Sequence, residues 1–139
     1  MLALLLAPLL FSAPLVAASA PTCSGADPAI ISATVQSKTP NGDLNHYVIA
    51  ITVQNVGSMK QASNLLQSVD IFQDATKVDQ KGLQPLAPGK SQTVTYAFDR
   101  AMGAAHDSTH FRFSLDMHAA SAPSNADCST SNDTFRLDV

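Results

Sequence analysis

Two segments of the chain each join a strand-like run to a turn of fixed chemistry: residues 53–57 and residues 83–96. In the first segment Asn55 and Gly57 end the run, and both residue types tolerate the positive φ that a tight turn needs. In the second segment Pro88 presets φ, and Gly89 takes the position that would strain other residues. Such units indicate a chain of short strands separated by turns.

Apolar residues recur at every second position in the strand-like runs. Tyr47, Ile49 and Ile51 show the pattern, which directs one row of side chains toward a core. Val48 and Ala50 lie between them and are also apolar. They predict that this strand is central in its sheet and covered on both faces.

The same reasoning predicts seven strands: residues 28–36, 44–54, 69–73, 76–81, 91–99, 109–117 and 134–139. Residues 58–67 are ambiguous, because their apolar residues lie at near-helical spacing and allow one or two helical turns. No internal repeat is present. The sequence therefore predicts an all-β fold, a seven-stranded Ig-like antiparallel β-sandwich.

The charge composition of the chain argues against a nucleic-acid partner. Charged residues make up 14% of the chain and the formal net charge is −3. A nucleic-acid partner would require a basic stripe, and none is present in the sequence. We expect neither a nucleic-acid partner nor a cofactor.

The first twenty residues resemble a secretory signal peptide. They carry no charged side chain, and their apolar run is short, broken by proline and followed by small residues. Cleavage is expected after Ala18 or Ala20, which leaves one domain over residues 21–139. The alternative is a buried N-terminal helix, which the two internal prolines disfavour. We therefore expect a periplasmic or secreted protein with no transmembrane segment in the mature chain.

The two cysteines agree with export. Cys23 precedes the first predicted strand, and Cys128 precedes the last at a similar distance. The first and last strands of a seven-stranded sandwich run in the same direction, so both cysteines should emerge at one pole. A disulfide between them is predicted, with a chain-entropy stabilisation of about 4–5 kcal/mol. Lipidation of Cys23 is the alternative, although the residues before it do not form a lipobox.

Histidine and methionine near residues 102–118 raise the possibility of a copper or zinc site. His106 and His118 should lie at opposite ends of one strand, roughly 30 Å apart for about nine residues. They are too distant to share a metal ion. His106 and His110 remain weak candidate ligands, and ordinary surface histidines are the alternative.

Catalytic patterns are hard to find in the sequence. It contains no Gly-x-Ser-x-Gly elbow and no Ser-x-x-Lys motif. All of its acidic residues are Asp, which disfavours a tuned general acid for glycoside hydrolysis. We expect a protein that is not an enzyme. A protease inhibitor that presents the loops 58–64, 102–108 and 118–130 at one pole is a further alternative, although the tryptophan-bearing motif of one such class is absent.

Four segments carry a resemblance to a known family. Residues 27–35, the Val-Gln-Asn-Val-Gly of 53–57, the Leu-Ala-Pro-Gly-Lys-Ser turn within 83–96 and the closing Asn-Asp-Thr of 132–134 resemble a CARDB domain, a cell-adhesion-related module. The resemblance covers residues 27–139. It departs from the family pattern at 124–129, where an acidic run is replaced, and in its cysteine pair. It implies a seven-stranded sandwich used in adhesion, surface display or docking, without catalysis.

The sequence thus predicts an exported, non-catalytic binding or adhesion module whose partner is another exported or cell-surface protein. Asn132 also fits an N-glycosylation pattern, but we interpret Asn55 and Asn132 as residues that close turns. The alternative function is periplasmic metal binding through His106 and His110. Docking is expected at the loops of one pole or along an exposed sheet edge.

Overall fold

The computed structural model of the chain describes residues 24–103, 108–118, 122 and 126–139. These residues form seven strands and one short 3-10 helix: β1 (Pro28–Asn41), β2 (Leu44–Asn55), β3 (Gln67–Gln73), β4 (Thr76–Leu83), β5 (Ser91–Ala101), β6 (His110–Met117), η1 (Thr130–Asn132) and β7 (Thr134–Asp138). The predicted all-β fold with seven strands is confirmed.

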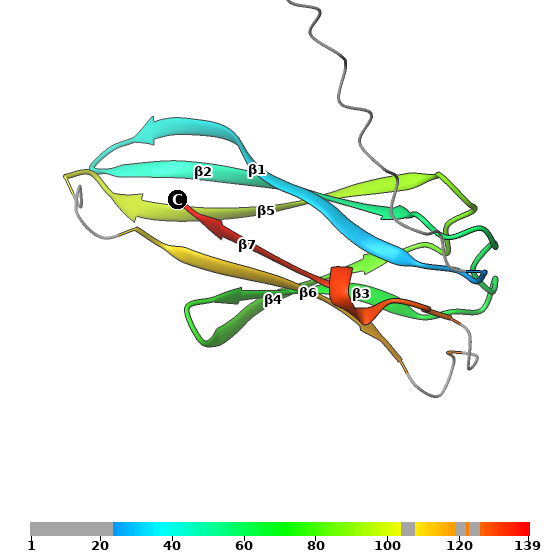
Figure 1. Cartoon of the computed structure of the whole chain (residues 1–139). Coiled ribbons are helices and arrows are strands. Elements are labelled where there is room, and N and C mark those ends of the chain that lie inside the picture. Colours follow the sequence, from blue (N-terminus) through cyan, green and yellow to red (C-terminus); the bar gives the residue numbers. More distant parts are fainter. Residues whose placement is uncertain (1–23, 104–107, 119–121, 123–125) are drawn as a thin grey trace, which may run out of the picture.

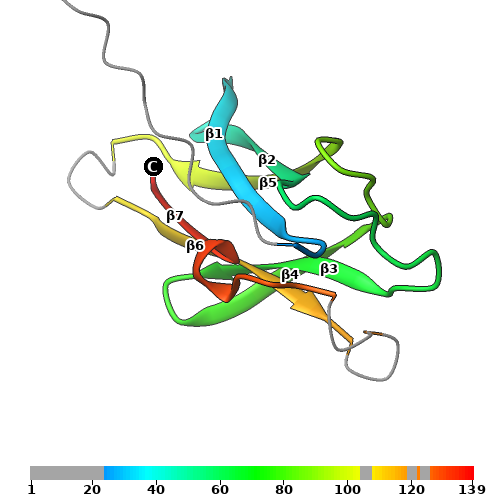
Figure 2. The ribbon, with the colours of Figure 1, turned by 45° about the vertical axis from the view of Figure 1, so that its right-hand side comes forward.

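The strands form two antiparallel sheets that pack face to face as a sandwich (Figure 1; Figure 2). One sheet has the order β1-β2-β5, and the other has the order β4-β3-β6-β7. β2, β3 and β6 are therefore paired on both sides, whereas β1, β5, β4 and β7 are edge strands.

The core lies between the sheets and follows the predicted alternation. Ile49, Ile51 and Val53 of β2 are completely buried, as are Ile71 and Phe113 of the facing sheet. Burying an aliphatic or aromatic side chain of this size contributes roughly 1.5–3 kcal/mol. The sandwich is therefore held mainly by this single apolar layer.

The prediction that β2 is covered on both faces is wrong in part. β2 is central, but Val48 and Ala50 on its outer face are only half-buried. The sandwich has two layers in the described part of the chain, so cross-strand neighbours shield these side chains and no third layer does.

The first hairpin is longer than the sequence predicted. β1 continues to Asn41 because it stays paired with β2 up to the turn, where Asn41 faces Leu44. Gly42, with φ of 59°, supplies the left-handed conformation of this two-residue turn.

Residues 58–67 contain no helix. Leu65 is buried, but Leu66 and Met59 are 62% and 50% exposed, so the apolar residues do not form one stripe. The segment is an irregular connection from β2 to β3. Its Gln61 side chain is buried, whereas Met59 is turned toward solvent. The helical alternative was therefore wrong.

Candidate functional site

Asn55 closes the end of β2 with a fully used side chain. Its Oδ1 accepts hydrogen bonds from the backbone N–H groups of Asp27 (3.0 Å) and Gly57 (3.1 Å). Its Nδ2 donates to the carbonyls of Met59 (2.9 Å) and Leu86 (3.0 Å). The side chain is completely buried. It therefore connects the start of β1, the β2–β3 connection and the β4–β5 connection at one pole.

The two turn glycines act in different ways. A Cβ on Gly57 would lie 2.3 Å from the carbonyl oxygen of Gly25, so only glycine allows this approach of two backbones. Gly89 has φ of 72°, and the N–H of Lys90 donates to the carbonyl of Ala87 at 3.0 Å. With Pro88 before it, Gly89 has the arrangement of a type II turn.

A pair of buried glutamines adds to this pole and was missed from the sequence. Gln61 and Gln67 exchange side-chain hydrogen bonds at 2.8 and 2.9 Å. Gln61 Oε1 also accepts from the N–H of Leu86, and Gln67 Nε2 donates to the carbonyl of Gln84. No clear signal in the sequence pointed to this pair, because residues 58–67 contain several other polar side chains. The pairing depends on the irregular course of this segment.

Carboxyl groups gather where β1 and β7 begin. Asn132 Nδ2 donates to Asp27 Oδ1 at 2.9 Å. Burial, together with the charge and hydrogen bond of Asp127 and the charge of Asp27, raises the pKa of the Asp133 carboxyl to about 7. One buried oxygen of each side chain has no hydrogen-bond partner among the described residues: Asp127 Oδ2, Asn132 Oδ1 and Asp133 Oδ1. The Asn132 side chain therefore links η1 to the segment before β1 rather than closing a local turn as the sequence suggested. It lies within a cluster that is costly to ionise fully.

The predicted disulfide is only half within the described residues. Cys23 lies outside them. The N–H of Cys128 donates to the carbonyl of Ala26 at 3.1 Å. The backbone of Cys128 therefore lies beside a residue close in sequence to Cys23, which supports the disulfide as a proposal.

The candidate metal ligands can be compared only in part, because His106 also lies outside the described residues. His110 Nδ1 is 2.7 Å from Asp138 Oδ1, and the hydrogen bond and charge of Asp138 raise the pKa of His110. Among the described residues no group of three His, Cys, Asp or Glu side chains is placed to hold a metal ion. The metal site stays a prediction.

The loops proposed for an inhibitor do not share one pole. The N–H of Met102 donates to the carbonyl of Asp43, at the first hairpin. The N–H of Ser58 donates instead to the carbonyl of Gly25, at the other end of β1. The loop that begins at Met102 is therefore at the opposite pole from the loop 58–64, and this expectation was wrong.

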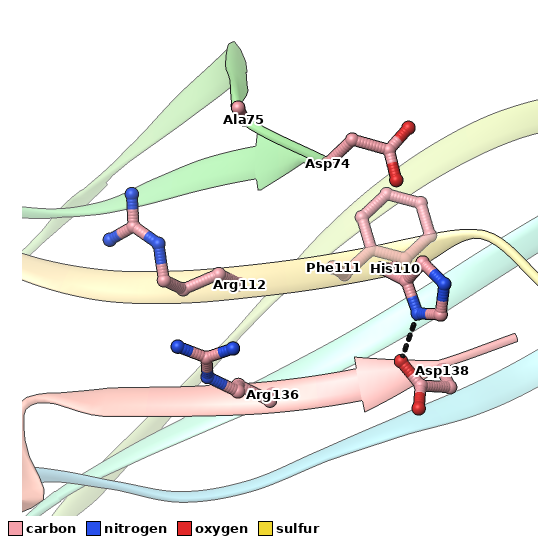
Figure 3. A pocket seen from close by; sticks show the side chains of 7 residues that line it. All are labelled: Asp74, Ala75, His110, Phe111, Arg112, Arg136 and Asp138. Carbon is pink, nitrogen blue, oxygen red and sulfur yellow. Dashed lines mark hydrogen bonds and ion pairs between the residues drawn. The ribbon is translucent and has the colours of Figure 1, made fainter.

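A surface depression of about 500 Å³ lies over β6 and β7, beside the β3–β4 turn (Figure 3). It is lined by residues from the β3–β4 turn and from two neighbouring strands: Asp74, Ala75, His110, Phe111, Arg112, Arg136 and Asp138. The register of β6 and β7 sets Arg112 directly opposite Arg136, and His110 directly opposite Asp138. The two guanidinium groups and the His–Asp pair therefore occupy different parts of the depression (Figure 3).

Local structure fixes both ends of this depression. The N–H of Asp74 donates to the carbonyl of His110 at 2.8 Å, which holds the β3–β4 turn beside β6. The guanidinium carbon of Arg112 lies 3.8 Å from the centre of the Phe72 ring. Such stacking is a favourable cation–π contact and restricts the side chain.

Ser108 extends the His–Asp pair into a row of three. Its Oγ is 3.4 Å from His110 Nε2, while His110 Nδ1 bonds to Asp138. The side chains of His110 and Asp138 are 61% and 70% exposed. The sequence marked His110 as a candidate ligand, but it could not show Asp138 opposite, because a long loop separates the two strands.

The edge strand β1 has an irregular backbone that affects whether another strand could pair with it. The pairing of β1 with β2 is interrupted by irregularities between Ile30 and Ser32 and between Val35 and Ser37. Bulges of this kind make an edge a poor acceptor for an added strand. The long edge of β1 is therefore protected, although Ile31 is 46% exposed.

Comparison with known proteins supports the fold. No protein-family model matches the chain, and no curated protein matches it. The CARDB domain of a Pyrococcus furiosus protein, crystallised in complex with di-metal ions, has a TM-score of 0.57 and 12% identity, over 86% of this chain and 96% of that one. A domain of a Methanosarcina acetivorans protein, described as a cell surface protein, has a TM-score of 0.53 and 19% identity, over 82% and 90%.

At these identities the likeness establishes the fold alone. The chain has the fold of a CARDB domain, so the resemblance inferred from the sequence is confirmed at that level. Within the described ranges no helix is long and apolar enough to cross a membrane.

Proposed function

We propose that this chain is an exported, non-catalytic module that docks a protein or another ligand at the cell surface. The observation that carries the proposal is the depression beside Arg112 and Arg136. Its two arginines stand on paired strands rather than on loops, so their positions are fixed before a ligand arrives. The likeness in fold to a domain of a cell surface protein supports the same setting.

The N-terminal segment supports export. Residues 1–20 have the composition of a signal peptide, and the proposed Cys23–Cys128 disulfide fits the oxidising compartment that export would reach. We propose a periplasmic or secreted location on these grounds. A fusion of the whole chain to a reporter that is active only outside the cytoplasm should be active, and deletion of residues 1–20 should abolish that activity.

The row of Ser108, His110 and Asp138 is the feature that most favours an enzyme instead. A serine hydrolase uses this order of residues to activate the hydroxyl. However, the Ser108–His110 distance is 3.4 Å, and both His110 and Asp138 are mostly exposed to water. Charge stabilisation of a transition state is strong only where water is excluded. We therefore interpret the row as a surface hydrogen-bond chain.

The binding test uses the exported chain, purified after export, and isolated cell envelopes of the source organism. Saturable binding is expected, and pretreatment of the envelopes with protease distinguishes a protein partner from a non-protein one. Phospholipid vesicles serve as the control and should not bind. Absence of saturable binding contradicts the docking function, and ester hydrolysis that Ser108→Ala abolishes contradicts the non-catalytic one.

A further inference from the structure

Arg112 and Arg136 face each other on β6 and β7 although their charges repel. They are paired in register, and both lie on the outer face of the sheet. Like charges directly opposite each other disfavour strand pairing. The juxtaposition of the two charges does not stabilise the fold, so it calls for another explanation.

The arginine in the facing sheet shows what a structural arginine does here. Arg100 donates to the Tyr47 hydroxyl at 2.9 Å and to the carbonyl of Val139. Among the described residues, no carboxylate lies within ion-pair distance of Arg112 or Arg136. Each guanidinium has five N–H donors, and those of this pair are left to solvent.

The acidic side chains of the depression do not fill this gap. Asp138 is held by His110, and Asp74 stands on the β3–β4 turn above the imidazole ring (Figure 3). Both carboxylates thus lie at the His110 end, whereas the guanidinium groups extend away from it (Figure 3). The charge of the depression is therefore separated into a basic part, at the two guanidinium groups, and a part that holds both carboxylates, of which only Asp138 is paired among the described residues.

We propose that the depression is an oxyanion-binding site in which Arg112 and Arg136 together hold one carboxylate, phosphate or sulfate group of a ligand. This inference rests on the proposed docking function and names the chemistry of its ligand. Guanidinium groups bind such oxyanions through two parallel N–H···O bonds. An anion between the two arginines would also remove their mutual repulsion.

Two features prepare the site for such a ligand. The Phe72 ring beneath Arg112 limits the orientations of that guanidinium before binding. The depression, at about 500 Å³, has the size of a small-molecule site. It accommodates the sugar or amino-acid unit that bears the anionic group as well as the group itself.

The test follows the arginine Nε–Hε resonances by NMR while the exported chain is titrated separately with inorganic phosphate, sulfate and glucuronate at constant ionic strength. The resonances of Arg112 and Arg136 should shift together and saturate for at least one anion. The anion that binds best identifies the source of the charge. The site is disproved if none of the three shifts these resonances at up to about 50 mM, a concentration well above a millimolar Kd.

Variants separate a built site from simple charge attraction. Arg112→Gln combined with Arg136→Gln should weaken binding at least about tenfold. Lys90→Gln, which removes one charge on the β4–β5 connection, should leave the affinity within about twofold. Asp74→Asn should strengthen binding, because it removes a facing negative charge. An equal loss for Lys90→Gln, or none for the double variant, overturns the proposal.

The outcome is independent of the envelope test. Envelope binding that the double arginine variant retains leaves the docking function standing and refutes the oxyanion site. Anion binding without envelope binding supports the oxyanion site and contradicts the docking function.

Discussion

The pole around Asn55 and the outer face around Arg112 treat polar groups in opposite ways. At the pole the amide of Asn55 is buried and makes four hydrogen bonds. On the outer face two guanidinium groups stand opposite each other with no carboxylate partner among the described residues. Buried and satisfied polar groups specify a fold. Exposed and unsatisfied groups cost the fold little and remain available to a ligand.

The largest effect is expected at Gly57, which tests the pole at its tightest contact. Gly57→Ala places a Cβ within 2.3 Å of the Gly25 carbonyl oxygen, so the two backbones must separate. We expect the free energy of unfolding, measured with urea, to fall by about 3 kcal/mol or more. Gly82→Ala is the control, because a Cβ there meets nothing within 4 Å. A loss at Gly57 no greater than that at Gly82 would show that this approach is not needed.

Replacement of Asn55 should give the next largest loss of stability. Asn55→Ala removes the side-chain partner of two backbone N–H groups and of the Met59 carbonyl. The Leu86 carbonyl keeps the N–H of Gln61. We expect a loss of about 3–5 kcal/mol in the free energy of unfolding. Asn64→Ala, at an exposed site in the same connection, should change stability by less than about 0.5 kcal/mol. Similar urea midpoints for the two variants would show that the buried hydrogen bonds of Asn55 do not stabilise the fold.

The carboxyl cluster gives a smaller, pH-dependent effect. Asp133 has a folded pKa of about 7, above the value of about 3.8 of an unperturbed group, so the folded chain keeps a proton that the unfolded chain releases. Stability should therefore fall as pH rises from about 4 to 7. We expect a loss of about 1 kcal/mol, well below the full shift, because the carboxyl group remains partly in contact with water.

Asp133→Asn tests this directly. The variant should match the wild type at pH 4 and be more stable at pH 8. Taking the difference between the two proteins at each pH cancels the contribution of His110, whose raised pKa also weakens folding as pH rises. If the stability of the wild type and of Asp133→Asn changed with pH in the same way, the group that keeps its proton on folding would not be Asp133.

The outer face should show the smallest effect on stability. Arg112→Gln with Arg136→Gln removes a repulsive pair and one stacking contact on Phe72, two changes that oppose each other. We expect the free energy of unfolding to stay within about 0.5 kcal/mol of the wild type, measured beside the pole variants. A loss as large as that of Asn55→Ala would mean that the arginines support the fold.

The contrast also explains what could be predicted from sequence. The alternation around Ile49 and Ile51 predicted the strands, because the facing layer only requires apolar side chains at every second position. The Pro88–Gly89 turn was predicted because its chemistry is local. The Gln61–Gln67 pair and the Arg112–Arg136 pair depend on how distant segments meet. No local pattern encodes the register of β6 and β7 across the loop that joins them.

One competition measurement tests the central claim, that the outer face binds and the pole holds the fold. Binding of the exported chain to cell envelopes is measured with increasing concentrations of the anion that binds best in the NMR titration, against sodium chloride at equal ionic strength. We predict displacement by the anion at concentrations near its own Kd, and little displacement by the chloride control. Envelope binding that a saturating anion leaves unchanged would contradict the account.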